Sequence, residues 1–323
     1  MMSGTTGSSE HEGSWDIRGR TVLVTGGNSG IGRATALELA ARGAEVVITA
    51  RDRAKGAAAE DALNRELAER RMPASPGGLE AARVGSVVWM ELDLADRSSI
   101  QAFTRAFLGR YPALHVLVHN AGLVLEDRRE TVDGFEATFG VNHMGPFTLN
   151  GLLLDRLKAS APARVVVVAS AAHFKARGGM DLDDLQSKRG YDGVSAYARS
   201  KLANVQFTKA LARRLAGTGV TANCLHPGVV ATDFAGDGDM PGGLWGWAFR
   251  WLRPLMLTPE KGARTSVHLA CAPELDGVSG EYFVRCRQAT PSGPARDEAA
   301  AEELWAVSEA LGNAASLAPD RPD

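Results

Sequence analysis

The chain has 323 residues, of which 45% are hydrophobic and 23% charged, with a net charge of −2. This length suffices for one large α/β domain or two small ones. The near balance of charge excludes a nucleic-acid-binding protein that works through a basic face. The three cysteines, Cys224, Cys271 and Cys286, are far apart and odd in number, which indicates reduced thiols rather than a disulfide framework. Their spacing predicts no metal site.

The two ends of the chain are polar. Residues 1–15 lack a basic stretch followed by an apolar one, so they are not a signal peptide, and they are predicted to be a disordered tail. The last ten residues, 314–323, have the same character. Because no stretch of about 18 apolar residues occurs, no transmembrane segment is expected. The sequence therefore predicts a cytoplasmic protein.

Short apolar runs alternate with longer helical patterns between these ends. Strands are predicted at 21–25, 45–49, 86–91, 114–119, 164–169, 221–225 and 281–284, and helices from about residue 31 and at 54–71, 98–111, 134–157, 196–215 and 260–270. Runs such as "RVVVVAS" show no polar alternation, which is typical of strands buried on both faces. The pattern predicts one Rossmann-type α/β domain over 16–290, a doubly wound parallel sheet flanked by helices. A C-terminal extension, 291–323, follows, with a helix at 295–311 outside the core.

A glycine-rich stretch follows the first strand directly. Gly26, Gly30 and Gly32 in "TGGNSGIGRATALELAARG" are spaced G-x-x-x-G-x-G, with Gly27 in addition. This differs from the G-x-G-x-x-G dinucleotide motif, but the physics is the same. Backbone without Cβ atoms can approach a pyrophosphate, and the next helix offers its N-terminal amides to the charge. The alternative is a turn packed tightly for structural reasons alone.

A tyrosine and a lysine share one face of a later predicted helix. Tyr197 and Lys201 in "YARSKLANV" lie one turn apart, so the ammonium is expected to pull the phenol pKa from about 10 toward neutrality. Such a pair by itself is usually structural. Here it follows the glycine turn, "HNAG" at 119–122 and a strand that ends in Ser170, and it precedes "HPGVVATD" at 226–233.

Together these motifs resemble the short-chain dehydrogenase/reductase family over roughly residues 18 to 290. Four segments are most similar to its retinol-dehydrogenase-like and WW-domain-oxidoreductase-like branch: "TGGNSGIGRATALELA", "VNHMGPFTLN", "GYDGVSAYARSKLANVQFTKALARRL" and "LTPEKGARTSVHLA". The resemblance implies a nicotinamide-dependent oxidoreductase with the fold predicted above.

The resemblance also implies a catalytic set, formed by Asn142, Ser170, Tyr197 and Lys201. The hydroxyls of Ser170 and Tyr197 would hydrogen-bond a carbonyl oxygen while Tyr197 gives up its proton to it. Lys201 would hold the ribose of the cofactor, and Asn142 would anchor a water that relays protons to Lys201. The family often has two serines at the end of the fifth strand, whereas here Ala169 precedes Ser170, so only one hydroxyl is available.

Cofactor contacts follow from the same resemblance. They comprise Thr25, Gly26, Asn28, Ser29, Gly30, Ile31, Gly32, Arg51, Asp93, Leu94, Asn120, Ala121, Gly122, Tyr197, Lys201, Pro227, Gly228, Val230 and Thr232. The glycines would cradle the pyrophosphate and Asp93 would hydrogen-bond the adenine. Asn120 and Gly122 would line the cofactor floor, next to His119, where the family often has asparagine.

The end of the second strand predicts the choice of cofactor. An acidic residue there would bind the adenosine ribose diol and repel a 2′-phosphate. The chain instead has Ala50 followed by Arg51, which leaves room and supplies a guanidinium fork for phosphate. Arg33, in the first turn of the preceding helix, is a second candidate for this phosphate. The sequence therefore predicts NADP(H), unless Arg51 is merely a solvated loop residue.

A tryptophan-rich segment, 233–258, follows the sixth strand, and family resemblance makes it a helical substrate lid. Its apolar residues fall on one helical stripe, formed by Leu244, Trp245, Ala248, Phe249, Leu252 and Met256. The stripe predicts a bulky apolar aldehyde, ketone or secondary alcohol as substrate. Two alternatives are that these side chains pack on the core or on another subunit, and that Arg250 and Arg253 belong to a membrane-surface helix.

The combined reading is an NADP(H)-dependent oxidoreductase that interconverts a carbonyl and an alcohol. A non-catalytic NADP-binding sensor or scaffold is the alternative, although such a protein usually loses catalytic residues. His119, His143, His173 and His226 share no spacing that indicates a histidine mechanism, and no G-x-S-x-G motif supports a hydrolase. A membrane-bound retinoid enzyme would lack its anchor. The expected partner is a small-molecule substrate, and a homo-oligomer is expected by family analogy only.

Overall fold

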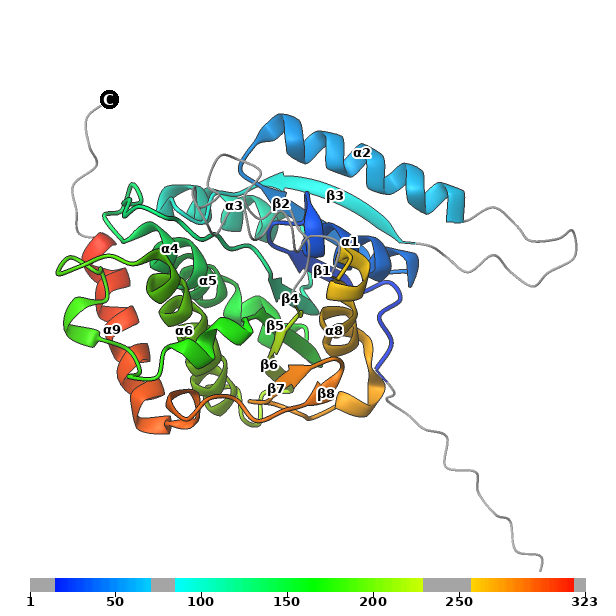
Figure 1. Ribbon diagram of the computed structural model, residues 1–323. Coiled ribbons are helices and arrows are strands. Elements are labelled where there is room, and N and C mark those ends of the chain that lie inside the picture. The colour runs from blue at the N-terminus through cyan, green and yellow to red at the C-terminus, as the bar shows by residue number, and fades with distance from the viewer. Residues whose placement is uncertain (1–14, 71–84, 229–256, 317–323) are drawn as a thin grey trace, which may run out of the picture.

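The computed structural model describes residues 15–70, 85–228 and 257–316. They form an eight-stranded sheet with helices on both faces (Figure 1). The strands are β1 (Thr21–Val24), β2 (Glu45–Ala50), β3 (Ser86–Glu91), β4 (Val116–His119), β5 (Ala163–Val168), β6 (Val220–His226), β7 (Tyr282–Val284) and β8 (Arg287–Gln288). Their spatial order is β3-β2-β1-β4-β5-β6-β7-β8, and all neighbours pair in parallel except β7 and β8. This confirms the predicted doubly wound α/β fold.

The helices agree with the predicted ones to within a few residues, with one exception. They are α1 (Gly30–Ala41), α2 (Arg53–Arg70), α3 (Arg97–Arg110), α4 (Ala137–Phe139), α5 (Gly145–Ala159), α6 (Gly193–Arg214), α8 (Pro259–Cys271) and α9 (Glu298–Ser316). The single helix expected at 134–157 is in fact α4, a π-helical turn η1 (Gly140–Met144) and α5. The predicted lid, 233–258, lies outside the described residues except for its last two.

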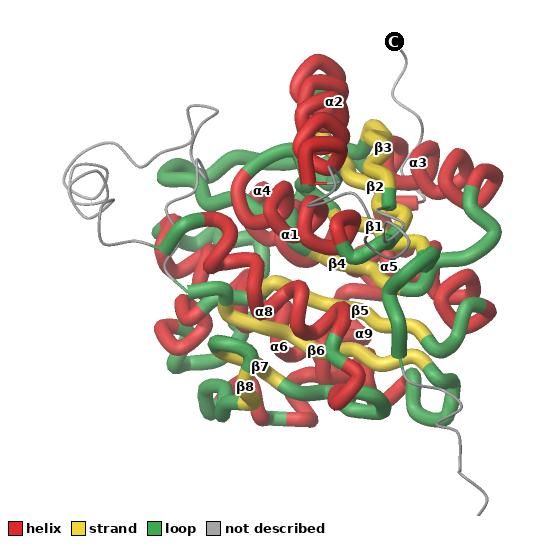
Figure 2. The backbone as a smooth tube through the Cα atoms, turned by 90° about the vertical axis from the view of Figure 1, so that its right-hand side faces the viewer, coloured by secondary structure: helices red, strands yellow, loops and turns green. Residues whose placement is uncertain are grey.

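Helices cover both faces of the sheet (Figure 2), and each face has its own apolar core. Leu23 and Val165 belong to the cluster that packs on α3, α5 and α6, whereas Val24 and Val166 belong to the cluster on α1, α2 and α8. Successive side chains of a strand point to opposite faces, so both must be apolar when helices cover both. This explains the absence of polar alternation in the strands.

The packed structure begins within the segment predicted as a tail. Residues 1–14 lie outside the described residues, but Trp15 is buried, and its Nε1 donates to the carbonyl oxygen of Ala270 at 2.8 Å. The guanidinium groups of Arg20 and Arg164 lie 4.2 and 4.1 Å from the centre of its ring. Trp15 thus joins the start of the chain to the end of α8.

The C-terminal helix α9 packs against α6 instead of standing outside the core (Figure 1). Ala301, Leu304 and Ser308 are buried, and this spacing puts them on one face of the helix. The ring of Trp305 stacks on Phe207, with 5.8 Å between centroids. The helix continues to Ser316, into the stretch predicted as a disordered tail, since its buried face gives the chain a surface to pack on.

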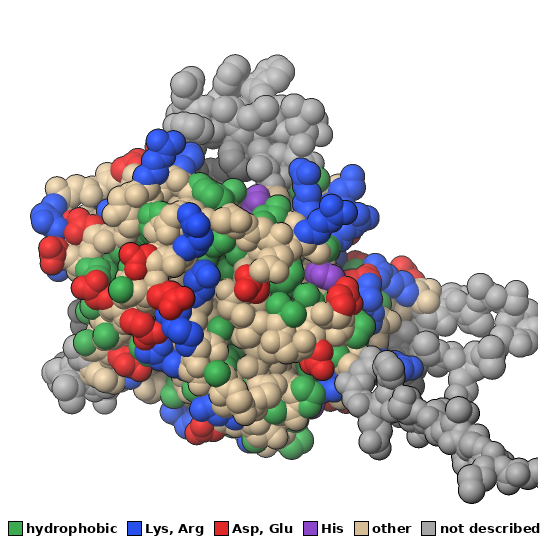
Figure 3. Space-filling view, turned by 90° about the horizontal axis from the view of Figure 1, so that it is seen from below, with side chains coloured by type: hydrophobic (Ala, Val, Ile, Leu, Met, Phe, Trp, Pro, Cys, Tyr) green, Lys and Arg blue, Asp and Glu red, His purple; other side chains and the backbone are tan. Residues whose placement is uncertain are grey.

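The surface carries charges of both signs. On the face seen in Figure 3, acidic and basic side chains are interspersed, and apolar side chains lie singly or in small groups between them. Within the described parts of the chain, no helix is both long and apolar enough to cross a bilayer. The same residues hold no cluster of three or more His, Cys, Asp or Glu side chains suited to a metal ion.

Candidate active site

Thr25 locks the ends of β1 and β4 together. Its buried hydroxyl donates to the carbonyl oxygen of Val118 at 3.3 Å and accepts from the backbone N–H groups of Asn120 at 3.0 Å and Ala121 at 3.1 Å. The chain therefore leaves both strands at the same place, at the carboxyl edge of the sheet. In doubly wound folds this edge is where ligands bind.

The glycine turn between β1 and α1 has no room for side chains. A Cβ atom on Gly32 would lie 2.3 Å from the carbonyl oxygen of Gly26 and 2.4 Å from Nδ2 of Asn120. Gly26 and Gly30 have φ angles of 63° and 53°, which glycine adopts at little cost. Asn120 closes the turn, because its Nδ2 donates to the carbonyl oxygen of Thr25 at 2.9 Å.

The N-terminus of α1 is open to an anion. Its N-cap Ser29 makes no side-chain capping hydrogen bond, and its first turn contains no acidic residue. The N-terminal amides and the helix dipole therefore keep their capacity for negative charge. A cradle without Cβ atoms in front of such a helix fits the pyrophosphate of a dinucleotide, and Gly26, Asn28, Ser29, Gly30, Ile31 and Gly32 would hold it.

The other predicted cofactor contacts lie around this turn. Arg51 is exposed directly after β2. Arg33, the second candidate for a phosphate contact, is instead engaged in an ion pair with Glu66 of α2. Oδ1 of Asp93 accepts from the N–H of Ala95 at 2.9 Å, so this carboxylate shapes the turn after β3. Leu94 is buried, and Ala121 and Gly122 follow Asn120 directly. Pro227 and Gly228 follow β6. Val230 and Thr232 lie outside the described residues.

Asn142 braces the loop after β4 from within the π-helical turn. Its Oδ1 accepts from the N–H of Leu123 at 2.7 Å, and its Nδ2 donates to the carbonyl oxygen of Leu123 at 2.8 Å and to Oγ of Ser200 at 3.0 Å. A Cβ atom on Gly122 would lie 3.0 Å from Oδ1 of Asn142 and 3.3 Å from Nζ of Lys201. Asn142 and Lys201 thus meet at Gly122, and a water relay between them stays a prediction.

Ser170, Tyr197 and Lys201 come together at the ends of β5 and α6. Tyr197 and Lys201 lie one turn apart on α6, as predicted, with Nζ 5.6 Å from the centre of the phenol ring. Nζ donates to the carbonyl oxygen of Val168, the last residue of β5, at 3.2 Å. The Ser170 side chain hydrogen-bonds the Tyr197 phenol. The three functional groups predicted for catalysis therefore form one polar cluster, in which Lys201 is buried and Ser170 and Tyr197 are partly exposed.

The predicted lowering of the Tyr197 phenol pKa toward neutrality is wrong for this structure. Burial raises the pKa of Tyr197 to about 12, and the hydrogen bond from Ser170 opposes this rise only in part. Burial also lowers the pKa of Lys201 to about 8. Both shifts have the same cause, because a group taken out of water resists carrying charge. The phenol is therefore protonated at neutral pH.

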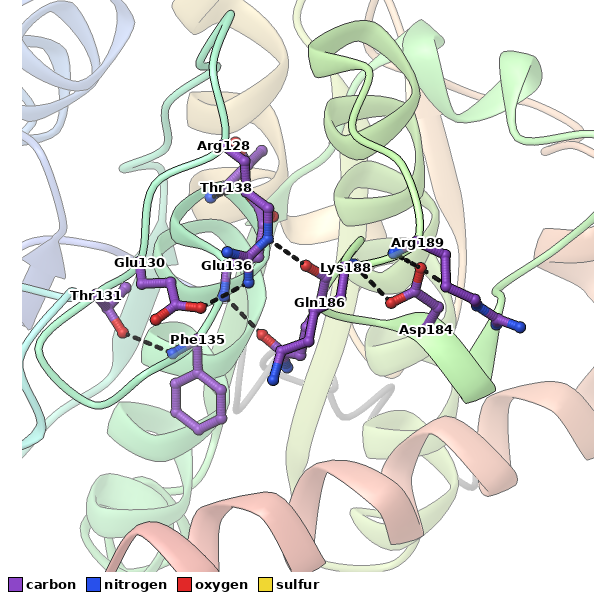
Figure 4. A network of polar contacts seen from close by, with 10 residues as sticks. All are labelled: Arg128, Glu130, Thr131, Phe135, Glu136, Thr138, Asp184, Gln186, Lys188 and Arg189. Atoms are coloured by element: carbon purple, nitrogen blue, oxygen red, sulfur yellow. Dashed lines mark hydrogen bonds and ion pairs between the residues drawn. The ribbon is translucent and has the colours of Figure 1, made fainter.

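A polar network ties the loop after β4 to the loop after β5 (Figure 4). The guanidinium of Arg128 donates to the carbonyl oxygen of Gln186 at 2.9 Å, and the Gln186 side chain accepts from the N–H of Glu136 at 2.6 Å. Glu136 is buried, and its carboxylate accepts from the N–H groups of Thr138 and Phe139, each at 2.8 Å. The network holds together the two loops that lead to Asn142 and Tyr197.

Sequence reasoning missed several residues that support this cluster. Ser200 holds the Asn142 carboxamide, and its place directly before Lys201 was the only available signal. His173 and His226 bind the backbone next to Ser170. His119 is buried, and burial lowers its pKa to about 4.

Comparison with known proteins identifies the class to which this fold and site belong. The family model "short chain dehydrogenase" matches residues 20–182 and 184–239. The chain belongs to the short-chain dehydrogenase/reductase family, in its retinol-dehydrogenase-like branch. It is therefore an oxidoreductase that works on alcohol and carbonyl groups with a nicotinamide dinucleotide.

The particular relatives agree with this assignment. The chain is 44% identical over 301 residues to human retinol dehydrogenase 14, and the match covers 91% of this chain and 87% of that protein. It is 44% identical over 297 residues to human retinol dehydrogenase 12, with 92% and 87% covered.

Solved structures give the same fold. An uncharacterised protein from Mycobacterium paratuberculosis is 33% identical, with a TM-score of 0.70 and 93% of this chain and 96% of that chain covered. A structure from Beutenbergia cavernae, described as that of an NAD(P)-dependent gluconate 5-dehydrogenase with NADP bound at low occupancy, is 27% identical, with a TM-score of 0.62 and 84% of this chain and 97% of that chain covered.

Proposed function

We propose that the protein is an NADP(H)-dependent oxidoreductase that interconverts a bulky apolar aldehyde or ketone and the corresponding alcohol. The observation that carries this proposal is the polar cluster of Ser170, Tyr197 and Lys201 beside the glycine turn. The cluster offers two hydroxyls and one ammonium at the edge of the sheet where a dinucleotide fits. A non-catalytic sensor would have no need of this set.

The chain's own residues supply position and proton transfer, while a bound nicotinamide would supply or accept the hydride. Tyr197 is the general acid for reduction, since its raised pKa keeps the phenol protonated at neutral pH. Oγ of Ser170 accepts from the N–H of Ala172 at 3.1 Å, which leaves its proton for the phenol or for a substrate oxygen. The Lys201 ammonium faces the ring and stabilises the phenolate that forms when the proton leaves.

NADP(H) is favoured over NAD(H) by the end of β2. Ala50 leaves space there, and the exposed Arg51 offers a guanidinium to a 2′-phosphate. The NADP bound in the structure from Beutenbergia cavernae supports the same choice. Arg33 contributes only if its ion pair with Glu66 opens.

A large apolar substrate is favoured by side chains around the cluster. Phe174, on the turn after Ser170, is 47% exposed, and Val194, one turn before Tyr197 on α6, is 42% exposed. Exposed apolar side chains beside a polar reaction centre suit a ligand with a polar head and an apolar body. The names of the retinol dehydrogenases that the chain resembles, and the apolar sequence of 233–258, support the same substrate class.

Oxidation of NADPH by the purified protein, followed at the nicotinamide absorbance, tests the proposal. The substrates are retinaldehyde and straight-chain aldehydes of increasing length, each also measured with NADH. Catalytic efficiency should climb with chain length, because each buried CH₂ contributes about 0.8 kcal/mol. A flat series or a preference for small anionic substrates would contradict the apolar site, and a preference for NADH would contradict the cofactor choice. No turnover with tight NADPH binding would favour the sensor. A cytoplasmic location stays a prediction.

A further inference from the structure

Ser170 is the N-cap residue of a short 3-10 helix, η2 (Ala171–Lys175). Hydrogen bonds with two histidines fix the backbone of its first turn. Oγ of Ser170 accepts from the N–H of Ala172 at 3.1 Å, so this backbone group decides where the hydroxyl proton can point. The position of Ala172 in turn depends on the peptide groups before it. Two imidazole rings bind those groups.

His173 binds the carbonyl oxygen of Ser170 from inside the core. Its ring is fully buried, with Nδ1 2.6 Å from that oxygen and Nε2 3.1 Å from the backbone nitrogen of Ser292. A backbone N–H only donates, so Nε2 must carry a lone pair and the proton must be on Nδ1. His173 is thus fixed as the neutral Nδ1–H tautomer. A second proton would face the N–H of Ser292, and burial lowers the pKa of His173 accordingly.

His226, at the end of β6, binds the next peptide group. Its Nδ1 accepts from the N–H of Ala171 at 3.1 Å, so this nitrogen of His226 carries no proton. Burial lowers the pKa of this ring, and the charge of Arg285, from the turn after β7, lowers it further, as a charge on His173 would. Protonation at Nδ1 would replace the hydrogen bond to Ala171 by a repulsion between two donors.

We propose that His173 and His226 are positioning residues that orient the Ser170 hydroxyl through the backbone of Ser170 and Ala171, and that both must be neutral to do so. This inference rests on the proposed catalytic function of Ser170. It predicts that turnover falls on the acid side as the imidazoles take up protons. Because the charged form of each is disfavoured, this fall begins below the ordinary histidine pKa of about 6.5.

Paired variants of His226 test the hydrogen bond directly. In His226→Asn, Oδ1 takes about the place of Nδ1, accepts from Ala171 and cannot be protonated in this range. In His226→Ala the acceptor is lost. With retinaldehyde and NADPH at pH 7.5, kcat should fall about tenfold in His226→Ala with little change in NADPH affinity, and His226→Asn should keep at least half of it. Below pH 6.5, kcat of His226→Asn should fall less steeply than in the wild type.

The same pair is made at His173, where the amide of His173→Asn keeps a donor toward Ser170 and His173→Ala removes it. Thermal unfolding with NADPH present shows whether each variant folds, and His268→Asn, on the far end of α8, is the matched control. His173→Asn should be more active than His173→Ala. Equal turnover of the Ala and Asn variants at either position, or an unchanged acid limb in His226→Asn, would overturn the inference.

A double-mutant cycle separates this inference from the proposed function. If His226 acts through Ser170, then His226→Ala should cost little more in a Ser170→Ala background, although it costs about tenfold alone. An additive loss would overturn the positioning role while leaving the proposed function intact. If Ser170→Ala has wild-type turnover, then the catalytic assignment of Ser170 fails, and the positioning role fails with it.

Discussion

The glycine turn and the Ser170–Tyr197–Lys201 cluster lie at the same edge of the sheet, but they are built in opposite ways. The turn between β1 and α1 depends on glycines that lack side chains, because neighbouring atoms occupy the places where their Cβ atoms would be. The cluster works because polar side chains are present and burial shifts the pKa values of Tyr197 and Lys201. Changes in the turn should therefore act through shape and be insensitive to pH, whereas changes in the cluster should act through protons.

The largest effect on cofactor binding is expected from a substitution that changes the shape of the glycine turn. In Gly32→Ala the new Cβ atom would meet the carbonyl oxygen of Gly26 at 2.3 Å and Nδ2 of Asn120 at 2.4 Å. The turn must shift, and we expect loss of NADPH binding and a lower free energy of unfolding, by about 1–3 kcal/mol. Fluorescence titration with NADPH and denaturant unfolding measure the two effects.

Gly151→Ala is the matched control for this change. Gly151 is exposed in the middle of α5, and a Cβ atom there would have no neighbour within 4 Å. NADPH binding should not change, and the free energy of unfolding should rise by up to about 1 kcal/mol, because alanine is the better helix former. Normal NADPH binding by Gly32→Ala would show that shape does not govern the turn.

The next largest effect is expected from a substitution that removes the proton donor of the cluster. Tyr197→Phe removes one hydroxyl from α6, so the fold and NADPH binding should persist while kcat for retinaldehyde falls by about a hundredfold or more, as expected for a lost general acid. Tyr191→Phe removes a phenol that donates to the carbonyl oxygen of Leu125 at 3.1 Å, outside the cluster. Its kcat should stay within a few fold of the wild type. Near-normal turnover of Tyr197→Phe would remove the basis of the proposed mechanism.

The buried histidine next to the glycine turn should make stability depend on pH. The pKa of His119 is lowered from 6.5 to about 4 by burial, so the folded protein holds it neutral. As the pH falls from 6.5 to 4, the unfolded chain takes up a proton that the folded chain does not, and stability falls by up to about 3 kcal/mol. Above pH 6.5 this contribution is constant. Urea unfolding of His119→Asn should show a smaller loss over this range.

His268→Asn is the control for that experiment, since this ring on α8 is only partly buried. Its unfolding should follow the pH dependence of the wild type. If His119→Asn loses as much stability as the wild type between pH 6.5 and 4, then the buried ring is not the cause.

The smallest effect is expected at the rim of the glycine turn. Arg51→Ala should weaken NADPH binding by about tenfold and leave NADH binding unchanged, because NADH has no 2′-phosphate for a guanidinium to bind. Arg53→Ala changes an exposed arginine two residues further on, at the start of α2, and should alter neither affinity. Equal effects of the two substitutions on NADPH would reduce Arg51 to a general contributor of positive charge. The dissociation constants come from fluorescence titration.

The sequence by itself determined the strands, the sheet and the place of the site. These features follow from local patterns: the apolar runs, the glycines after β1 and the spacing of Tyr197 and Lys201. Such patterns can be recognised in the sequence because local backbone geometry requires particular residue types at particular positions. The C-terminal helix was also predicted, but its packing on α6 was not. An amphipathic pattern indicates that one face of a helix is buried, but it does not indicate which element covers that face.

Only the tertiary structure decided the state of the site. The phenol pKa of Tyr197 depends on its burial, which no i, i+4 spacing specifies, and so the predicted lowering was wrong. Asn142 is bound to Ser200, and His173 to Ser292, through contacts between distant parts of the chain. Desolvation and hydrogen-bond partners are properties of the packed surroundings, because they depend on which segments exclude water from a group, and this is fixed only when the sheet and its helices close around it.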